Sequence, residues 1–158
     1  VLVAARAMEA GKSIDEAIAL VNQAKQAMMV VFVVDTLEFL HRGGRIGGAA
    51  RLLGSALNLK PVLTIVDGRI EALEKVRSRG KSLRRLVQIF EEKWADRQPT
   101  EVAVMQAEAG ADVANLASML RERLGRDPDY IRELTPVVGT HGGPGTLGVA
   151  AYALDESP

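Results

Sequence analysis

The sequence predicts an α/β (α+β-like) domain, built as a two-layer, mixed six-stranded sheet with helices. The β-branched run VVFVVD at 30–35 is typical of a buried strand. The segment VLTIV-DG-RIEALEKV at 62–76 places Asp67-Gly68 between two apolar runs, which is the sequence of a type I′ hairpin. Downstream, helical and strand patterns mix without strict alternation, which argues against a plain doubly wound sheet.

Periodicity and capping residues predict the other elements in chain order. A short helix over 2–10 ends at Gly11, and a capping box of Ser13 and Glu16 begins a longer amphipathic helix. Asp35 and Glu38 suggest a second capping box, before a short helix that ends near Gly43. The rest are helices over 49–59, 81–94 and 111–124, and strands over 100–107, 130–134 and 148–154.

Composition narrows the function classes. Twenty basic residues balance twenty acidic ones among 158, so net charge favours neither nucleic acid nor an anionic membrane as partner. The absence of cysteine excludes disulfides, thiolate catalysis and Cys-based zinc sites. The longest apolar run, 27–34, falls well short of the ~20 residues that span a bilayer. We expect a cytoplasmic protein without membrane insertion, and residues 1–158 as a single domain whose preceding domain is absent, since the sequence starts without Met as if inside a helix.

Three motifs that suggest nucleotides or metals fail on spacing. The Gly-Lys-Ser tripeptides at 11–13 and 80–82 lack the upstream glycine of a P-loop. The GxGxxG match at 143–148 is followed only by 149–158, too few residues for the rest of a dinucleotide-binding unit. His41 and His141 have no carboxylates at ligand spacing, so no metal site is expected.

The stretch VVGTHGGPGTLGVA at 137–150 is the best candidate site. Glycines with positive φ let backbone N–H groups form an anion nest, and Thr140 and His141 add side-chain donors. The alternative is a tight corner before the last strand, which explains Gly and Pro but not Thr-His. Arginines leave a similar choice open. Arg45 in GGRIGG either meets a phosphate or carboxylate or caps carbonyls. Arg77, Arg79 and Arg85 in RSRGKSLRR either contact an anion or an acidic partner or form a solvated loop and helix face.

Five motifs in order, VDTLEFL, GGRIGG, LNLKP, DGxIxxLEKVR and GTHxGPG, resemble the C-terminal half of the DegV family, and the resemblance covers essentially the whole chain. It implies a bacterial protein that binds a long-chain fatty acid without a cofactor, and a C-terminal DegV-type domain. The acyl tail would lie in this domain and the carboxylate at the junction with the absent domain. Some relatives present the fatty acid to a dihydroxyacetone-kinase-like fatty acid kinase.

Residue by residue, His141 matches the histidine of GTHxGPG, which the resemblance makes a carboxylate contact, and Thr140 and Gly142 flank it. Arg45 and Arg77 match family arginines, whose role in folding, phosphate or kinase contact stays open. We expect Arg77 and Arg79 to contact a partner. Apolar side chains that either wall an acyl pocket or form simple core are Phe32, Ile46, Leu52, Leu53, Leu57 and Leu63.

Three hypotheses follow. The first is a fatty acid carrier in which burial of the tail drives binding, at ~0.8 kcal/mol per methylene. The alternative is an enzyme with His141 as general acid or base in phosphoryl or acyl transfer, which needs a nucleophile or metal that the sequence does not supply. The third, compatible with the first, is a docking module for a kinase through Arg77.

Overall fold

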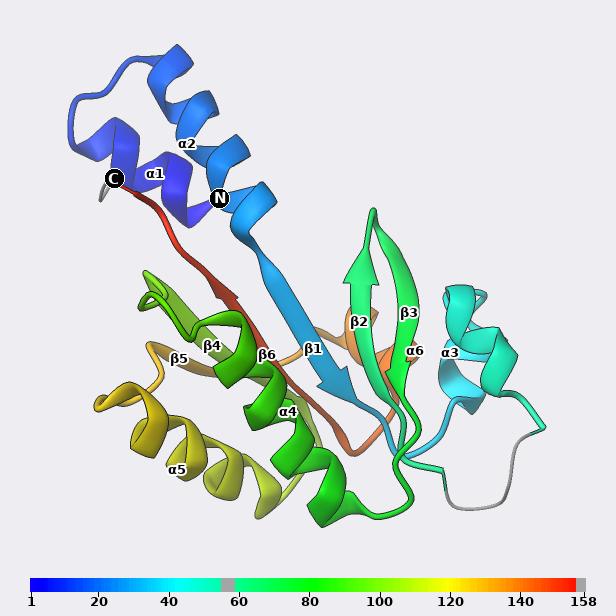
Figure 1. Ribbon diagram of the computed structural model, residues 1–158. Coiled ribbons are helices and arrows are strands. Elements are labelled where there is room, and N and C mark those ends of the chain that lie inside the picture. Colours follow the sequence, from blue (N-terminus) through cyan, green and yellow to red (C-terminus); the bar gives the residue numbers. More distant parts are fainter. Residues whose placement is uncertain (55–58, 156–158) are drawn as a thin grey trace.

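A computed structural model describes residues 1–54 and 59–155, which form a six-stranded mixed sheet with helices on both faces (Figure 1). The strands lie in the order β3-β2-β1-β6-β4-β5. Only the β4–β5 pair is parallel among these neighbours. The predicted fold class is therefore confirmed. The strand bounds are β1 Met29–Val33, β2 Val62–Val66, β3 Arg69–Glu74, β4 Glu101–Ala107, β5 Tyr130–Glu133 and β6 Thr146–Tyr152.

The hairpin between β2 and β3 forms where turn chemistry predicts it. Asp67 has φ 48° and Gly68 has φ 74°, so both central residues adopt the positive φ that a type I′ turn requires. The local sequence alone is enough to fix this corner, and the hairpin it builds becomes one side of the pocket described below.

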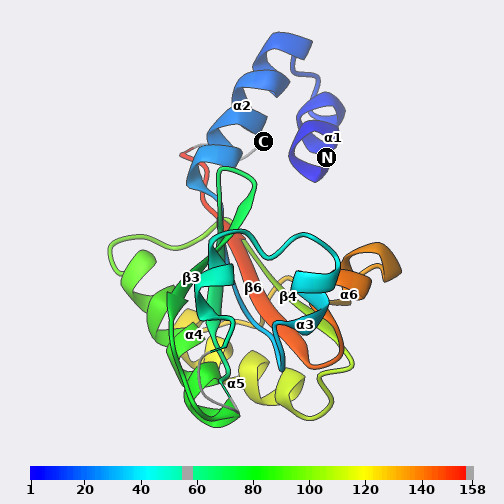
Figure 2. The same cartoon turned by 90° about the vertical axis from the view of Figure 1, so that its right-hand side faces the viewer.

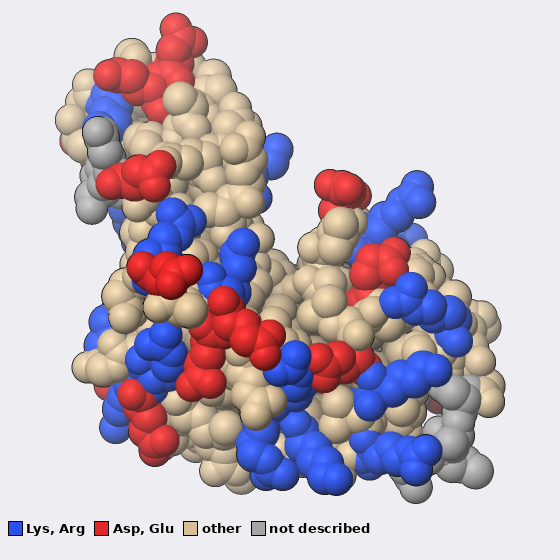
Figure 3. All heavy atoms as spheres, in the orientation of Figure 1, with Lys and Arg blue, Asp and Glu red and all other residues tan. Residues whose placement is uncertain are grey.

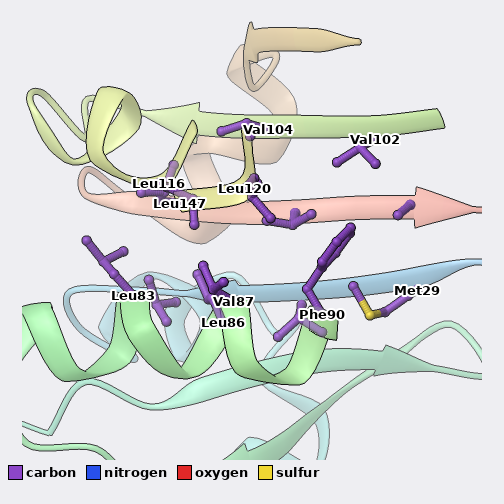
Figure 4. Packing of buried hydrophobic residues seen from close by; sticks show 14 of the residues in the cluster. Met29, Leu83, Leu86, Val87, Phe90, Val102, Val104, Leu116, Leu120 and Leu147 are labelled. Atoms are coloured by element: carbon purple, nitrogen blue, oxygen red, sulfur yellow. The ribbon is translucent and has the colours of Figure 1, made fainter. Parts of the chain in front are cut away.

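One face of the sheet is covered by two long helices, α4 (Arg79–Lys93) and α5 (Asp112–Leu124) (Figures 1 and 2). Their apolar stripes meet the strands in a dry core, in which α4 points several side chains toward the sheet (Figure 4). Alternate residues of β6 enter the same core. The fully or almost fully buried members include Leu86, Phe90, Trp94, Leu116, Leu120, Leu147 and Val149.

The opposite face carries shorter elements: α3 (Glu38–Arg42), the 3₁₀ helix η1 (Gly47–Leu52) and α6 (Pro136–Gly142) (Figure 2). Of these, α3 and η1 enclose a second, smaller core cluster over β1, β2 and β3. A helical hairpin of α1 (Leu2–Glu9) and α2 (Ile14–Ala27) projects from one end of the sheet (Figure 1). It packs on Tyr152 at the end of β6 through Val3 and Ala24.

Two local predictions about helices differ from the structure. The helix expected over 49–59 is a 3₁₀ helix that ends at Leu52, and the expected residues 55–58 lie outside the described part of the chain. The capping box of Ser13 and Glu16 is confirmed, whereas the box of Asp35 and Glu38 does not form.

Asp35 has other partners, which explains the absent box. Its carboxylate accepts hydrogen bonds from Lys60 at 3.1 Å and from Arg79 at 3.5 Å. The backbone N–H of Glu38 is met by Thr36 Oγ1 instead, at 3.2 Å. Two cations from distant segments thus bind the Asp35 carboxylate in place of a single local amide.

Among the helices of the described residues, none combines the length and apolar character needed to span a membrane.

Candidate ligand-binding site

A pocket of about 430 Å³ lies on the sheet face opposite α4 and α5. Its volume falls within the ~300–1,000 Å³ typical of small-molecule sites. The floor is sheet, one side is the β2–β3 hairpin, and the other side is α6 with the segment before it. The lining residues are almost all apolar: Val30, Phe32, Leu40, Ile65, Ile70, Met105, Leu134, Val137, Val138, Gly148, Val149 and Ala150, with Arg45, His141, Gly142 and Thr146.

Strand register explains the shape of the floor. Phe32 on β1 and Met105 on β4 both pair with Gly148 on β6, so two large side chains flank a position with none. A Cβ at Gly148 would stand 2.5 Å from the Cβ of Phe32, which is closer than real side chains come. The glycine therefore lowers the middle of the floor and lets the strands approach. Because side chains alternate along a strand, residues 146, 148 and 150 face the pocket, while the side chains of 147, 149 and 151 enter the main core. Val149 also borders the pocket, although it is only 1% exposed and belongs to that core.

His141 closes one end of this pocket from the last turn of α6. Its Nδ1 is buried and has no hydrogen-bond partner among the described residues. The same nitrogen packs against Gly43, where a Cβ would stand only 2.0 Å away. With Nδ1 fixed against the backbone of the α3 segment, Nε2 is the ring nitrogen left to meet a ligand.

The predicted anion nest of glycine amides is wrong for the amides whose partners are known. Gly143 donates to Gly139 O at 2.7 Å, Gly145 to Ala107 O at 2.7 Å, and Thr146 to Gly143 O at 3.3 Å. The reason is that 136–142 is a short helix with Pro136 at its start, and the following turn is tied to β4. The amide donors therefore serve the fold.

Side chains supply the polar end of the pocket instead. Arg45 is exposed and lines the pocket, and within the described parts of the chain its guanidinium makes one hydrogen bond, of 3.3 Å from Nη1 to Gly43 O, which leaves most of its donors for a ligand. Thr146 uses its hydroxyl hydrogen on Gly143 O at 2.8 Å. Thr140 is exposed, bonds to Pro136 O at 2.7 Å and is not a lining residue. Arg45 and His141 are thus the donors best placed for an anion.

The predicted wall residues are only partly at the pocket. Phe32 lines it. Leu52 and Leu63 are buried in the second core cluster beside it, and Ile46 packs against that cluster. Leu53 is 43% exposed and lies outside the lining, and the prediction at Leu57 falls outside the described residues.

The lining residues that sequence reasoning missed are mostly small or lie on distant strands, such as Val30, Met105, Gly148 and Ala150. Period-two alternation from Thr146 onward was the available signal, but choosing which side faces a ligand requires the strand register.

The basic segment before and within α4 divides into two kinds of arginine. Arg79 donates to Asp112 at 2.7 Å and to Asp35 at 3.5 Å, and joins the starts of α4 and α5 to the end of β1. Arg85 pairs with Glu74 and Glu92. Arg79, which was predicted to contact a partner protein, is instead paired with two carboxylates of its own chain. Arg77 is exposed in the loop before α4, where Lys and Arg side chains gather along the lower part of the face in Figure 3.

At the other end of the pocket face, a polar network ties α1 to the sheet. Glu101 on β4 accepts a hydrogen bond of 2.6 Å from the Tyr152 hydroxyl and one of 3.1 Å from Tyr130, and it pairs with Arg6. Burial alone would raise the pKa of Glu101, but the hydrogen bonds from Tyr152, Arg6 and Tyr130 together hold it below its ordinary value. Burial is the main cause, and the hydrogen bond to Glu101 the second, of a raised pKa of the Tyr152 phenol.

No metal-binding group of three or more His, Asp or Glu side chains occurs in the described parts of the chain.

Fold and site together define a mixed-sheet protein that holds an apolar pocket with a histidine and an arginine at one end. The chain belongs to the DegV family, whose model, described as "Uncharacterised protein, DegV family", matches residues 1–154.

Among curated relatives, a DegV domain-containing protein of Streptomyces coelicolor is 43% identical over 94% of this chain and 53% of its own length. Another, from Clostridium perfringens, is 33% identical over 99% of this chain and 54% of its own. The chain thus spans about half the length of these relatives.

Solved structures of DegV family proteins have the same fold as this chain. A DegV family protein of Thermus thermophilus, described by its fatty acid binding, superposes with a TM-score of 0.90 at 37% identity over 97% of this chain and 55% of that one. DegV of Bacillus subtilis, described as a fatty acid binding protein, gives a TM-score of 0.80 at 29% identity over 96% and 54%.

Proposed function

We propose that this chain binds a long-chain fatty acid, with the acyl tail in the pocket and the carboxylate at the end formed by His141 and Arg45. The observation that carries the proposal is the distribution of polarity: the lining is apolar except for a small group of polar side chains at one end. That is the pattern an amphipathic molecule with a long tail and an anionic head requires. Solved relatives described as fatty acid binding proteins support it.

Energetics favour this ligand class. Each buried methylene contributes ~0.8 kcal/mol, so a tail of a dozen or more carbons supplies most of the binding free energy. The head group then contributes mainly orientation and selection for an acid. The exposed side chains of Val137 and Val138, 74% and 50% exposed, border the pocket and leave room for a further covering surface. As an extension, we propose that the carboxylate lies at a junction with a second domain, of which this chain is the C-terminal partner.

Acid–base catalysis by His141 has less support. Its Nδ1 lacks the carboxylate or carbonyl partner, among the described residues, that orients a catalytic imidazole. Among the described residues that line the pocket, the other titratable one is Arg45, which cannot act as a base at ordinary pH.

We further propose that a fatty acid kinase reaches the ligand near Arg77, and that this docking depends on charge. Glutamate in place of Arg77 is expected to abolish a salt-sensitive complex, as measured by binding at low and high ionic strength. A complex that keeps its affinity and salt dependence in the variant would contradict a role for Arg77 while leaving fatty acid binding intact.

The direct test of the main proposal is organic extraction and mass spectrometry of the complete gene product, purified without added lipid. We expect a fatty acid at near one equivalent per protein. If the protein is empty, delipidated protein should still take up an added long-chain acid in a calorimetric titration. Protein that is both empty and unable to bind an added acid would contradict the proposal.

A further inference from the structure

We propose that Tyr152, the residue that follows the pocket lining on the same face of β6, blocks the far end of the pocket and sets the longest acyl chain that the protein accepts. This inference rests on the proposed function, because it concerns the same pocket. The observation behind it is that the pocket and the polar network of Glu101 share one strand, β6, and one face of that strand.

The pocket extends along strand β6. Thr146, Gly148 and Ala150 lie along β6 on the pocket side, beginning beside His141 on α6. At ~3.4 Å per residue, Thr146 and Ala150 are ~14 Å apart along the strand. A tail whose carboxylate meets His141 therefore has a straight, small-residue path along β6, toward the end where α1 and α2 project (Figure 1).

Tyr152 stands at the end of this path along β6. Tyr152 is the next residue on the same face of β6, ~7 Å beyond Ala150. It is only 7% exposed, because Val3 of α1 and Ala24 of α2 pack with it. Its large ring follows three small side chains, so the floor rises abruptly at this position.

A hydrogen bond and packing hold the Tyr152 ring in place. The Tyr152 hydroxyl donates to Glu101 Oε2 at 2.6 Å, and the same carboxylate is held by Arg6 and by Tyr130. A ring fixed by packing on one side and by a charge-assisted hydrogen bond at its tip has little freedom to swing away from an advancing tail. A free aliphatic side chain at this position would yield more easily.

The test is an affinity series of saturated fatty acids from about ten to about twenty carbons, measured by calorimetry on the delipidated complete gene product. Affinity is expected to rise about fourfold per added methylene until the tail reaches Tyr152, and then to stop rising. Ala150→Leu fills the path before the wall and should move the limit to shorter acids. Tyr152→Ala should move the limit to longer acids.

Tyr152→Phe is the matched control, because it keeps the ring and its packing on Val3 and Ala24 and removes only the bond to Glu101; its limit should lie between those of the wild type and Tyr152→Ala. If Tyr152→Ala does not fold, as judged by circular dichroism, Tyr152→Leu replaces it, because leucine keeps an apolar side chain against Val3 and Ala24 but lacks the ring, and it should also move the limit to longer acids. A limit that is the same in Ala150→Leu, Tyr152→Ala and wild type, with binding retained, would overturn the inference. A wild-type protein that binds no acid of any length would instead contradict the proposed function.

Discussion

The two faces of strand β6 have opposite fates within one short segment. Leu147, Val149 and Ala151 are at most 1% exposed and belong to the core beneath α4 and α5. Thr146, Gly148 and Ala150 alternate with them and form the floor of the pocket. The difference teaches that one face stabilises the domain and the other is left incompletely covered so that a ligand can complete it.

The largest expected effect comes from comparing two phenylalanines, Phe90 on α4 in the main core and Phe32 on β1 in the pocket. Phe90→Ala removes a ring that is 1% exposed in the main core and should lower the free energy of unfolding by ~3–5 kcal/mol, with little change in ligand affinity of the folded fraction. Phe32→Ala removes a half-buried pocket ring and should cost less than ~2 kcal/mol but weaken fatty acid binding about tenfold or more. Urea unfolding and calorimetry measure both. Equal losses of stability would show that the pocket face is ordinary core.

The same comparison shows what the sequence predicts well. Features decided by neighbouring residues are confirmed: Asp67-Gly68 turns the β2–β3 hairpin, and Ser13 with Glu16 caps α2. The strand run at 30–35 also appears, as β1. In each, the needed hydrogen bonds or φ angles lie within a few residues, so local chemistry suffices.

Features decided by distant residues are not predicted. Asp35 has the sequence of a helix cap but lies within reach of Lys60 and Arg79, which only the fold brings together. The segment 136–142 has the composition of a loop, yet its proline start and the contact of His141 with Gly43 in the α3 segment accompany a helix there. The pocket walls depend on strand register, so most of the predicted aliphatic walls lie in or beside the neighbouring core.

The second prediction concerns the polar end of the pocket face. His141→Ala removes the expected hydrogen bond to a charged carboxylate, which contributes ~1.5–3 kcal/mol, so affinity should fall about 10- to 100-fold while the unfolding transition moves little. Calorimetry with a fatty acid and with its methyl ester measures this. The wild type should bind the ester about as weakly as the variant binds the acid.

Thr140→Ala is the matched control for His141. Thr140 is the preceding residue on α6, is exposed, and donates its hydroxyl hydrogen to Pro136 O in its own helix, so its loss should leave affinity unchanged. Equal affinities of wild type and His141→Ala for the acid would remove His141 from the site and leave Arg45 as the head-group contact.

The third prediction tests how the site is positioned. Gly43 has φ −76°, which alanine adopts freely, so Gly43→Ala acts mainly through its clash with the His141 ring, 2.0 Å from Nδ1, with a weaker approach of 3.1 Å to Phe39 O. We expect a several-fold loss of affinity from the displaced imidazole, with a stability change of ~1 kcal/mol. Gly139→Ala on α6 meets no atom within 4 Å and should instead stabilise the protein by ~0.5–1 kcal/mol without affecting binding. If both variants bind like the wild type, the contact with Gly43 does not position His141.

The smallest effect should come from the far end of the pocket face, where Glu101 is held by hydrogen bonds. The pKa of Glu101 is lowered in the folded state, so its contribution to stability is fully present above its unfolded pKa, near 4.5. That contribution is lost as the pH falls below this value and the carboxylate protonates. Thermal unfolding between about pH 3 and pH 6 should therefore show less loss of stability in Glu101→Gln than in wild type, because glutamine does not titrate there. Parallel curves would mean that other carboxylates govern acid unfolding, and that Glu101 holds Tyr152 by a bond whose strength does not depend on its charge.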